Sequence, residues 1–459
     1  MNTVDIIAEI LKREGIEVLS CFPTTPIIES AAKAGIRPII CRQERVGVGI
    51  ADGYSRITNG DPLGVFAMQY GPGAENAYSG IATAYSDSTP LLLLPMGHPT
   101  DRQRVYPLYN AMDSFTTVNK QIEQITSSDS TDDVFRRAFS ALRTGRGGPV
   151  TVELPINIAS HDVSEESFHW PSNLKPTVSQ GNPADIQAAA RALCSAKYPV
   201  IHAGQGVLYA GATPELVELS ELLGAPVMTT LLGKSAFPEV HPLALGTGSG
   251  VMPGPVYHFV RRSDVIFGIG CSFTKHGMSM NLPEGKTLIH SSNDPRDINK
   301  DYEVEYPIVG DAKLVLRQMI DACIDLVGPK GELSAREDFY NQNAKEIKSE
   351  YEGWVGQWQH KLTDRMRPIN PYAVIAGFMQ AVPPSEAIVT HDSGSPRDQI
   401  TPFYKSNGPR TYIGWGKSHG LGTGLGLIIG AKIADPEKVC VNFMGDAAFG
   451  MVGLDFETA

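Results

Sequence analysis

The sequence predicts an α/β protein built from three doubly wound parallel-sheet domains, the third of them incomplete. Short apolar segments, such as GVFAM at Gly64–Met68 and VTVEL at Val150–Leu154, alternate with helical segments along the chain. Strands that are apolar throughout are typical of parallel sheets covered by helices on both faces. The chain has 459 residues, 42% of them hydrophobic and 19% charged, which indicates a globular protein with more than one core.

Residues 1–165 carry the first alternation of strands and helices and are predicted to form the first domain. An amphipathic helix at Val4–Glu14 opens it. Further helices are expected at Glu44–Thr58, Ala74–Tyr85 and Thr131–Leu142, and strands at Val18–Cys21, Pro38–Cys41, Gly64–Met68, Leu91–Pro95 and Val150–Leu154. This order predicts a parallel sheet with helices on both faces.

The remainder of the chain divides by composition. Residues 166–184 are polar and rich in proline, as in a linker. A central α/β domain is expected at 185–328, a charged helical connector at 329–370 and a third α/β domain at 371–459. The helices of the central and third domains are expected at Ala184–Ala196, Pro214–Leu223, Ala312–Val327 and Gly424–Ile433, and the strands at 198–204, 225–230, 264–270, 287–292, 387–392 and 439–444.

Charge and cysteine usage exclude several classes of protein. The net charge of -11 argues against broad contact with nucleic acid or an anionic membrane. The six cysteines are scattered and form no CxxC pair, so neither structural zinc nor a disulfide framework is expected. The start of the chain does not have the pattern of a signal peptide, and the longest apolar run, Leu91–Met96, is too short to cross a bilayer. A cytoplasmic protein is expected.

The stretch Val439–Ala459, VCVNFMGDAAFGMVGLDFETA, reads as a strand, a turn of small residues and the start of a helix. Unpaired N–H groups and the dipole at a helix start favour a diphosphate. The small residues of the turn, Gly445, Ala447 and Ala448, would allow a ligand to approach closely. Asp446 is placed to ligate a Mg²⁺ ion that bridges the phosphates. The alternative is an ordinary turn in which Asp446 caps the helix.

A second candidate is the stretch RQERVGVGIADGYSRITNG, in which Glu44 opens a helix whose next turns are small and apolar. A carboxylate at this entrance is expected to be partly buried, and burial suits a carboxyl group to sharing a proton. The alternative is a glutamate that only complements the helix dipole.

A third candidate lies between Tyr70 and His98. Gly71, Pro72 and Gly73 make a tight turn onto a helix, and His98 follows a buried strand at its carboxyl end, where open sheets bind ligands. The alternatives are a plain connecting loop and a structural histidine.

A fourth candidate is YIGWGKSHGLGTGLGLIIGAKIA, in which a run of glycines leads into a helix. The segment is similar to a dinucleotide fingerprint, but no acidic residue follows at the spacing of a βαβ unit, which argues against NAD. The other two glycine pairs, Gly204/Gly206 and Gly268/Gly270, lie at strand ends and suit either tight turns or the lining of a nucleotide site.

These four candidates, in this order, resemble the thiamine diphosphate (ThDP) enzymes of the acetolactate synthase-like family, and the resemblance covers the whole chain. It implies a pyrimidine-binding domain, a central domain and a diphosphate-binding domain. It implies that Glu44 hydrogen-bonds the aminopyrimidine of ThDP, so that the cofactor loses its thiazolium proton, forms an ylide and reacts through an enamine. It also implies that the pyrimidine domain of one subunit faces the diphosphate domain of another, as a homodimer or homotetramer with active sites at the subunit interface.

The resemblance also assigns residues to the cofactor. The family's GPGATN turn is matched by GPGAEN, with Glu75 in place of threonine. The family's GD motif is matched at Gly445-Asp446, with Asp446 as the metal ligand. The cofactor-binding residues are then Gly71, Pro72, Gly73, Asn76, Gly394, Ser395, His419, Gly420, Leu421, Gly445, Asp446, Ala447 and Ala448. Among them, Leu421 aligns with the residue that wedges ThDP into its bent shape, and the His419 carbonyl with the acceptor of the pyrimidine amine.

The chain departs from the family pattern at four places. Ser395-Pro396 follows Gly394 where acetolactate synthases have Gln-His, and His98 stands where they have an active-site glutamine. Residues 270–275 do not match the flavin-site segment, so FAD is possible but not supported. Only 13 residues follow Asp446, fewer than the distance to the family's second metal ligand, an asparagine. A longer parent chain is therefore expected.

The leading functional hypothesis is a ThDP- and Mg²⁺-dependent enzyme, a carboligase or decarboxylase, that cleaves or joins a carbon–carbon bond of a 2-oxo acid such as pyruvate. Glu44 and His98 are the expected catalytic residues. The alternatives are a lyase of the 2-hydroxyacyl-CoA or oxalyl-CoA decarboxylase kind, acting on an acyl-CoA substrate, and a non-catalytic cofactor-binding relative. The donor, the acceptor and any nucleotide in the central domain are left open.

Overall fold

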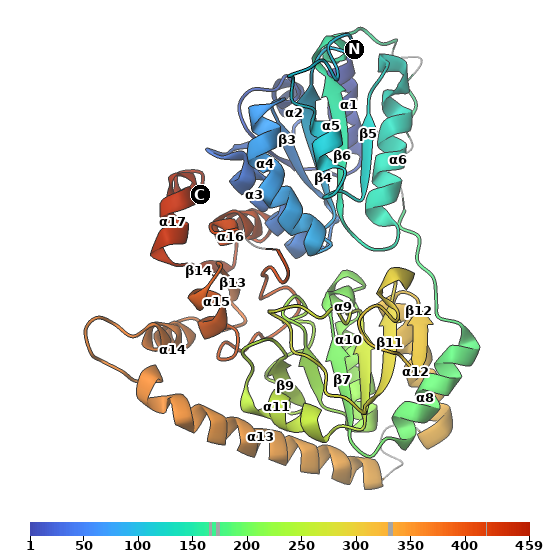
Figure 1. Ribbon diagram of the computed structural model, residues 1–459, viewed down its shortest axis with the longest axis vertical. Helices are drawn as coiled ribbons and strands as arrows, with labels where there is room; N and C mark the ends of the chain where they lie inside the picture. Colours follow the sequence, from blue (N-terminus) through green and yellow to red (C-terminus); the bar gives the residue numbers. More distant parts are fainter. Residues whose placement is uncertain (165–167, 171–174, 329–333, 419) are drawn as a thin grey trace. The chain divides into compact units, whose positions relative to one another are not determined.

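The computed structural model describes all residues except 165–167, 171–174, 329–333 and 419, and it groups them into two compact units (Figure 1). The first unit contains residues 1–177, 389–394 and 414–459, and the second contains 178–388 and 395–413. The prediction of an α/β protein with parallel sheets is confirmed. Among the described helices, none has the length and apolar character needed to cross a bilayer.

The first unit is built on a six-stranded sheet of order β2-β1-β3-β4-β6-β5, in which every neighbouring pair is parallel. The strands are β1 (Val18–Cys21), β2 (Arg37–Ile40), β3 (Gly64–Met68), β4 (Leu91–Gly97), β5 (Gln121–Gln124) and β6 (Pro149–Pro155). The helices are α1 (Thr3–Arg13), α2 (Ile27–Lys33), α3 (Glu44–Thr58), α4 (Pro72–Ser86), α5 (Ala111–Phe115), α6 (Thr131–Arg143) and α7 (Ile156–Ala159). The predicted bounds of α3 and β3 match the observed ones.

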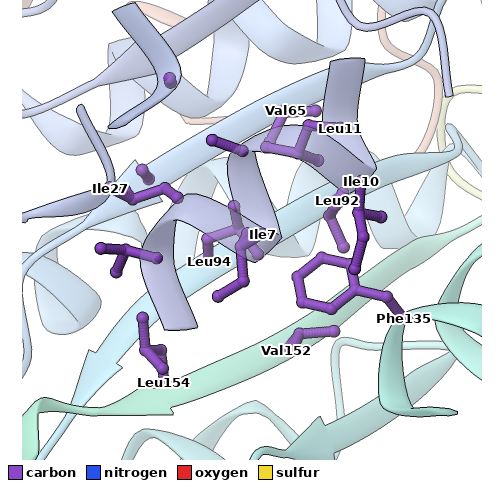
Figure 2. Close-up of a cluster of buried hydrophobic side chains, with 14 of the residues drawn as sticks. Ile7, Ile10, Leu11, Ile27, Val65, Leu92, Leu94, Phe135, Val152 and Leu154 are labelled. Atoms are coloured by element: carbon purple, nitrogen blue, oxygen red, sulfur yellow. The ribbon is translucent and has the colours of Figure 1, made fainter. Parts of the chain in front are cut away.

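Alternate residues of the central strands supply two separate cores, because successive side chains of a strand point to opposite faces. Val65 and Leu92 pack on one face with α1, α2 and α6, as Figure 2 shows for part of this cluster. Phe66 and Leu93 pack on the other face with α3 and α4. Because both faces are covered, all five residues of β3 are buried, as the apolar sequence predicts.

The second unit contains another six-stranded parallel sheet, of order β12-β11-β10-β7-β8-β9. Its strands are β7 (Pro199–Ala203), β8 (Val227–Thr229), β9 (Ala244–Thr247), β10 (Val265–Ile269), β11 (Thr287–Ser292) and β12 (Tyr306–Val309). Its helices are α8 (Pro183–Ser195), α9 (Gln205–Tyr209), α10 (Thr213–Leu223), α11 (Gly254–Arg262), α12 (Ala312–Val327), α13 (Ser334–Leu362), α14 (Pro371–Ala381) and α15 (Ser395–Ile400).

A small two-stranded sheet pairs β13 (Ala387–His391) with β14 (Val439–Phe443). Helix α16 (Thr423–Ala434) precedes β14, and α17 (Asp446–Val452) follows it. These are the elements predicted for the third domain. In the structure, α16, β14 and α17 belong to the same compact unit as the sheet β1–β6.

Helices α3 and α16 lie backbone against backbone, and glycines line the contact. A Cβ atom on Gly49 would lie 3.1 Å from Cα of Gly426, and one on Gly426 would lie 2.8 Å from Cα of Gly49. A Cβ atom on Gly430 would overlap the carbonyl oxygen of Ile50. Glycine is therefore required here by the space between the helices.

We expect Gly430→Ala to destabilise the first unit, because the methyl group must push α16 away from α3. Overpacking of this kind costs about 1–3 kcal/mol. The free energy of unfolding in urea is the measurement. The control is Gly356→Ala in α13, where a Cβ atom meets nothing within 4 Å and alanine should stabilise the helix by up to about 1 kcal/mol. Equal stability of the two variants would contradict the steric explanation.

Two buried histidines lie on the second sheet. His202 in β7 and His290 in β11 both pair in register with Gly268 of β10, and the ring of Phe273 lies near both. Neither ring nitrogen of His202 has a hydrogen-bond partner among the described residues. Burial, with a smaller contribution from His290, lowers the pKa of His202 to about 4. His202 is therefore neutral in the folded protein at neutral pH.

The lowered pKa of His202 predicts a loss of stability between pH 6.5 and about 4. The unfolded chain takes up a proton there that the folded chain cannot, so the free energy of unfolding falls as the pH falls, by at most about 1.4 kcal/mol per pH unit for one group. His202→Leu should reduce this slope, measured by denaturant unfolding at several pH values. His360→Leu, at an exposed position, is the control and should keep it. An unchanged slope in His202→Leu would count against the prediction.

Candidate functional site

Glu44 is the first residue of α3, and its side chain is buried rather than solvated. It follows Gln43, whose extended backbone starts the helix. The Nδ2 atom of Asn76, from α4, donates a hydrogen bond to Oε2 of Glu44 over 3.1 Å. The carboxylate is thus oriented by a side chain of the GPGAEN motif, which places two of the candidate motifs side by side.

The Gly71-Pro72-Gly73 turn joins β3 to α4 beside Glu44. Gly71 has a φ of +61°, which favours glycine, and Pro72 takes the first helical position, where its missing N–H is not needed. A Cβ atom on Gly73 would lie 3.4 Å from Oε1 of Glu44 and 3.0 Å from Cβ of Gln69. The absence of a side chain at Gly73 therefore leaves space for the carboxylate.

His98 follows β4, and its ring centroid lies 4.8 Å from that of Tyr70, the residue before the GPG turn. His98 lines a small cavity of about 120 Å³ together with residues from the carboxyl ends of β5 and β6. Gln124 donates a hydrogen bond to Glu153, whose pKa is raised chiefly by burial. Sequence analysis missed Glu153, although a lone acid in the apolar segment VTVEL is a signal that could have found it.

In the segment predicted to bind the diphosphate, β14 leads through Gly445 into α17. Asp446 is exposed, and its Oδ1 atom accepts a hydrogen bond from the N–H of Ala447 over 2.9 Å. Space around Gly445 is open, since a Cβ atom there would meet nothing within 4 Å. In the part of the chain that the structure describes, no three His, Cys, Asp or Glu side chains form a metal site, so Asp446 offers one protein ligand.

The start of α16 is held by Asp392, the residue after β13. Its carboxylate is fully buried and accepts hydrogen bonds from the N–H groups of Gly422 over 3.0 Å and Gly424 over 2.9 Å. Leu421 is half-buried just before this anchor. His419 lies outside the described residues.

Gly394 and Ser395, the other predicted residues near β13, are assigned to different units. Gly394 has a φ of +86° and belongs to the first unit, whereas Ser395 begins α15 in the second.

A buried charge cluster that sequence analysis missed lies in the first unit. Arg56 in α3 donates from Nε to Asp52 over 2.6 Å and from Nη2 to Asp87 over 3.1 Å. Asp87 is fully buried and also accepts hydrogen bonds from the N–H groups of Gly416 and Lys417. Asp52 and Arg56 lie in ADGYSR, residues 51–56 of the second candidate stretch, and this segment could have pointed to them.

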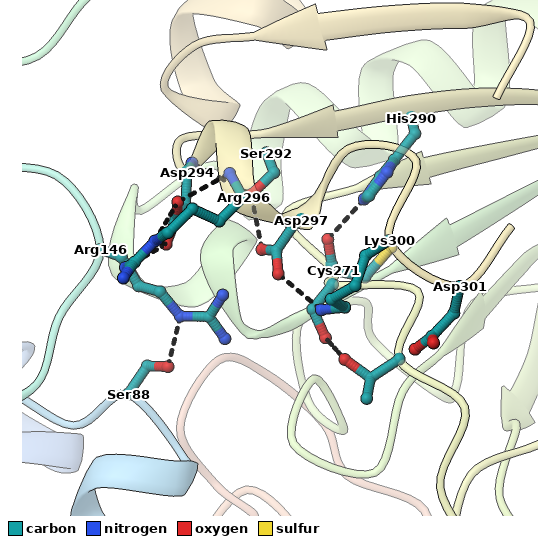
Figure 3. A network of polar contacts seen from close by, with 12 residues as sticks. Ser88, Arg146, Cys271, His290, Ser292, Asp294, Arg296, Asp297, Lys300 and Asp301 are labelled. Atoms are coloured by element: carbon teal, nitrogen blue, oxygen red, sulfur yellow. Dashed lines mark hydrogen bonds and ion pairs between the residues drawn. The ribbon is translucent and has the colours of Figure 1, made fainter. Parts of the chain in front are cut away.

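The glycines at strand ends of the second unit are accounted for by close packing of the backbone. A Cβ atom on Gly206 would lie 2.7 Å from Cα of Gly270, and one on Gly233 would lie 2.6 Å from the carbonyl oxygen of Ala203. Figure 3 shows the polar network near the end of β11, in which Asp297 accepts hydrogen bonds from Ser292 and Lys300. Close packing against backbone atoms accounts for Gly204, Gly206 and Gly270, and packing against the ring of Phe273 accounts for Gly268.

Comparison with known proteins identifies the family. Models described as the N-terminal TPP binding domain, the central domain and the C-terminal TPP binding domain of thiamine pyrophosphate enzymes match residues 1–117, 186–319 and 392–459, respectively. The three matched domains are thus those of a thiamine pyrophosphate enzyme. The chain belongs to the acetolactate synthase-like family of these enzymes, as the similarities to individual relatives show.

Three relatives illustrate the match. A probable acetolactate synthase large subunit of Methanococcus aeolicus is 32% identical over 98% of this chain and 77% of its own length. A probable acetolactate synthase large subunit of Methanocaldococcus jannaschii is 31% identical over 100% of this chain and 78% of its own. The acetolactate synthase isozyme 3 large subunit of Escherichia coli is 32% identical over 93% of this chain and 73% of its own.

The chain's residues fit thiamine diphosphate. Glu44 offers a buried, oriented carboxylate to a pyrimidine ring, and Gly73 leaves room beside it. Gly445, the N-cap residue of α17, has no side chain, and the space around it is open, as suits a diphosphate. Asp446 is a single oxygen ligand for Mg²⁺, an ion that usually completes its shell with phosphate oxygens and water.

We expect Asp392→Ala to destabilise the protein by about 1–3 kcal/mol, because the buried N–H groups of Gly422 and Gly424 lose their acceptor. Asp392→Asn keeps one carbonyl oxygen and should cost less. The free energy of unfolding in urea distinguishes the two. If Asp392→Ala unfolds at the same urea concentration as the unmodified protein, the carboxylate does not anchor α16.

Proposed function

We propose that this chain is the catalytic chain of an acetolactate synthase-like carboligase that uses ThDP and Mg²⁺ and acts on a 2-oxo acid such as pyruvate. The observation that carries the proposal is the buried Glu44 carboxylate, oriented by Asn76 beside the Gly71–Gly73 turn. Relatives named acetolactate synthase, matched over nearly the whole of this chain, support the choice of reaction.

The residues of the chain take distinct roles in this proposal. Glu44 binds the pyrimidine of the cofactor and holds a proton at its carboxylate, with Asn76 fixing its orientation. Gly445 and Ala448 present backbone N–H groups to the diphosphate, Ala447 lets it approach closely as a small residue, and Asp446 ligates Mg²⁺. When bound, ThDP supplies a carbon nucleophile and an electron sink for carbon–carbon bond cleavage and formation.

The remaining predicted residues complete the site. We assign His98 to the substrate carbonyl or carboxylate, Leu421 and Gly420 to the shape of the bound cofactor, and the His419 carbonyl to its amine. Gly394 and Ser395 are assigned to the diphosphate end. His98 lies beside Tyr70 in a cavity large enough for a small substrate.

The domain boundaries and the assembly are part of the same proposal. We assign the pyrimidine-binding domain to 1–165, the central domain to 185–328 and the diphosphate-binding domain to 371–459, with a linker at 166–184 and a connector at 329–370. The enzyme is proposed to be a cytoplasmic homodimer or homotetramer with active sites at the subunit interface. FAD is not assigned to any residue of the proposed site.

A second candidate is a lyase of the 2-hydroxyacyl-CoA or oxalyl-CoA decarboxylase kind. The replacement of the family's glutamine by His98 and the Ser395-Pro396 pair favour it. Release of CO₂ from pyruvate, but not from oxalyl-CoA, would support the carboligase. The opposite preference would support the lyase, and neither activity in a protein that binds ThDP would support a non-catalytic relative.

We expect Glu44→Gln to bind ThDP and yet to lose about 10²–10⁴-fold in the rate of CO₂ release from pyruvate, because the amide cannot hold and return a proton. Calorimetry measures binding, and a coupled CO₂ assay measures the rate. Glu75→Gln changes an exposed acid next to Asn76 and is the matched control. Full activity in Glu44→Gln would remove this carboxylate from the reaction.

A further inference from the structure

We propose that Asp87 is a positioning residue that fixes the segment Gly414–Ser418 and thereby sets the affinity of the protein for ThDP. The proposal rests on the proposed function, because it concerns the binding of that cofactor. It assigns a role to Asp87, which lies outside the candidate motifs, and to Asp52 and Arg56, which lie in the second candidate stretch.

The backbone of the segment is held directly by the Asp87 carboxylate. Asp87 ends α4 and has no exposed surface. The N–H of Gly416 donates to both carboxylate oxygens, over 3.1 and 3.2 Å, and the N–H of Lys417 donates over 3.3 Å. The next N–H, that of Ser418, donates to the hydroxyl of Ser86 over 3.2 Å. Three consecutive residues of the segment are thus fixed by the end of one helix.

Arg56 pairs with this carboxylate and adds a further contact. Its guanidinium binds Asp87 and Asp52 and donates from Nη1 to the carbonyl oxygen of Gly414. Burial raises the pKa of Asp87, and the positive charge of Arg56 acts in the opposite direction. An anion that accepts several N–H groups binds them more strongly than a neutral acceptor, since charge-assisted hydrogen bonds are the stronger kind.

The segment leads to the residues assigned to the cofactor and is anchored on their far side as well. Asp392 holds Gly422 and Gly424, so Gly420 and Leu421 lie between two buried carboxylates. A chain held at both ends samples fewer conformations, and less entropy is then lost when a ligand binds. Removal of one anchor should therefore weaken cofactor binding.

Arg56, which pairs with Asp87, lies on the same helix as Glu44. Glu44 begins α3, and Arg56 lies in the last turn of the same helix. At 1.5 Å per residue, about 18 Å of continuous helix joins the two side chains. Asp87 and Arg56 thereby fix the segment relative to α3 of the same subunit.

If Asp87 and Arg56 had a purely structural role, their substitution would affect ThDP affinity no more than the substitution of another buried ion pair. Buried ion pairs are weak evidence for stability, because the cost of removing charges from water offsets their attraction. The first unit contains a comparable pair for reference, in which Glu14 is buried against Arg143 and accepts a hydrogen bond from Trp170. Neither of these partners lies in the segment Gly414–Gly424.

The test compares Asp87→Asn and Arg56→Lys with the control Glu14→Gln. ThDP binding is measured by calorimetry at saturating Mg²⁺, at a temperature at which circular dichroism shows all variants folded. Hydrogen exchange of the Gly416 and Lys417 amides is measured without cofactor. We expect Asp87→Asn and Arg56→Lys to raise the Kd for ThDP by at least about tenfold and to speed exchange at these amides, and Glu14→Gln to change neither by more than about twofold.

Three results would decide against the proposal. Wild-type affinity in both Asp87→Asn and Arg56→Lys would overturn it and leave the proposed function intact. An equal loss of affinity in Glu14→Gln would show that general destabilisation is the cause and would also overturn it. Failure of the unmodified protein to bind ThDP would overturn the proposed function and the positioning role together. If Asp87→Asn does not fold, Arg56→Lys, which keeps the positive charge, decides alone.

Discussion

The backbone contact between α3 and α16 is the constraint on which the first unit depends. It brings the helix that begins with Glu44 against the helix that follows the glycine-rich segment. The contact leaves no space for side chains, so its geometry is set by main-chain atoms, which cannot repack as a side chain can. The distance between these two helices is therefore fixed.

Buried carboxylates complete this arrangement by binding main-chain N–H groups. Asp392 holds the start of α16, and Asp87 holds the segment before it. Each carboxylate is fully buried, and its burial would cost free energy if these N–H donors were absent. The same groups that stabilise the loop therefore also specify its conformation, since alternative conformations would leave a buried charge without partners.

The sequence predicted most of the fold because the apolar strands and amphipathic helices have clear periods. The strand at Gly64–Met68 and the helix at Glu44–Thr58 were predicted with the observed bounds. The strand β5, with the sequence QIEQ, was missed because it is polar and lies at the edge of its sheet. The strand β9, with the sequence ALGT, was missed because it contains a glycine, a residue that is depleted in strands.

The candidate site was predictable where a motif is local and not where it joins distant segments. The pairing of Glu44 with Asn76 follows from two quoted motifs. The interactions of Arg56 with Asp87 and Gly414 join positions far apart in the chain, and periodicity carries no information about such contacts. The predicted linker at 166–184 likewise gave no sign that Trp170 would be buried with a hydrogen bond to Glu14.

The contact between α3 and α16 also has a consequence for synthesis on the ribosome. Gly49 and Gly426 are 377 positions apart, and the second unit is encoded between them. At 5–20 residues per second, about 20–75 s pass between the synthesis of Gly49 in α3 and the synthesis of Gly426 in α16. During that interval the nascent first domain exposes a surface that only the last part of the chain covers. Its folding therefore becomes complete late in translation, and premature termination would leave that surface open.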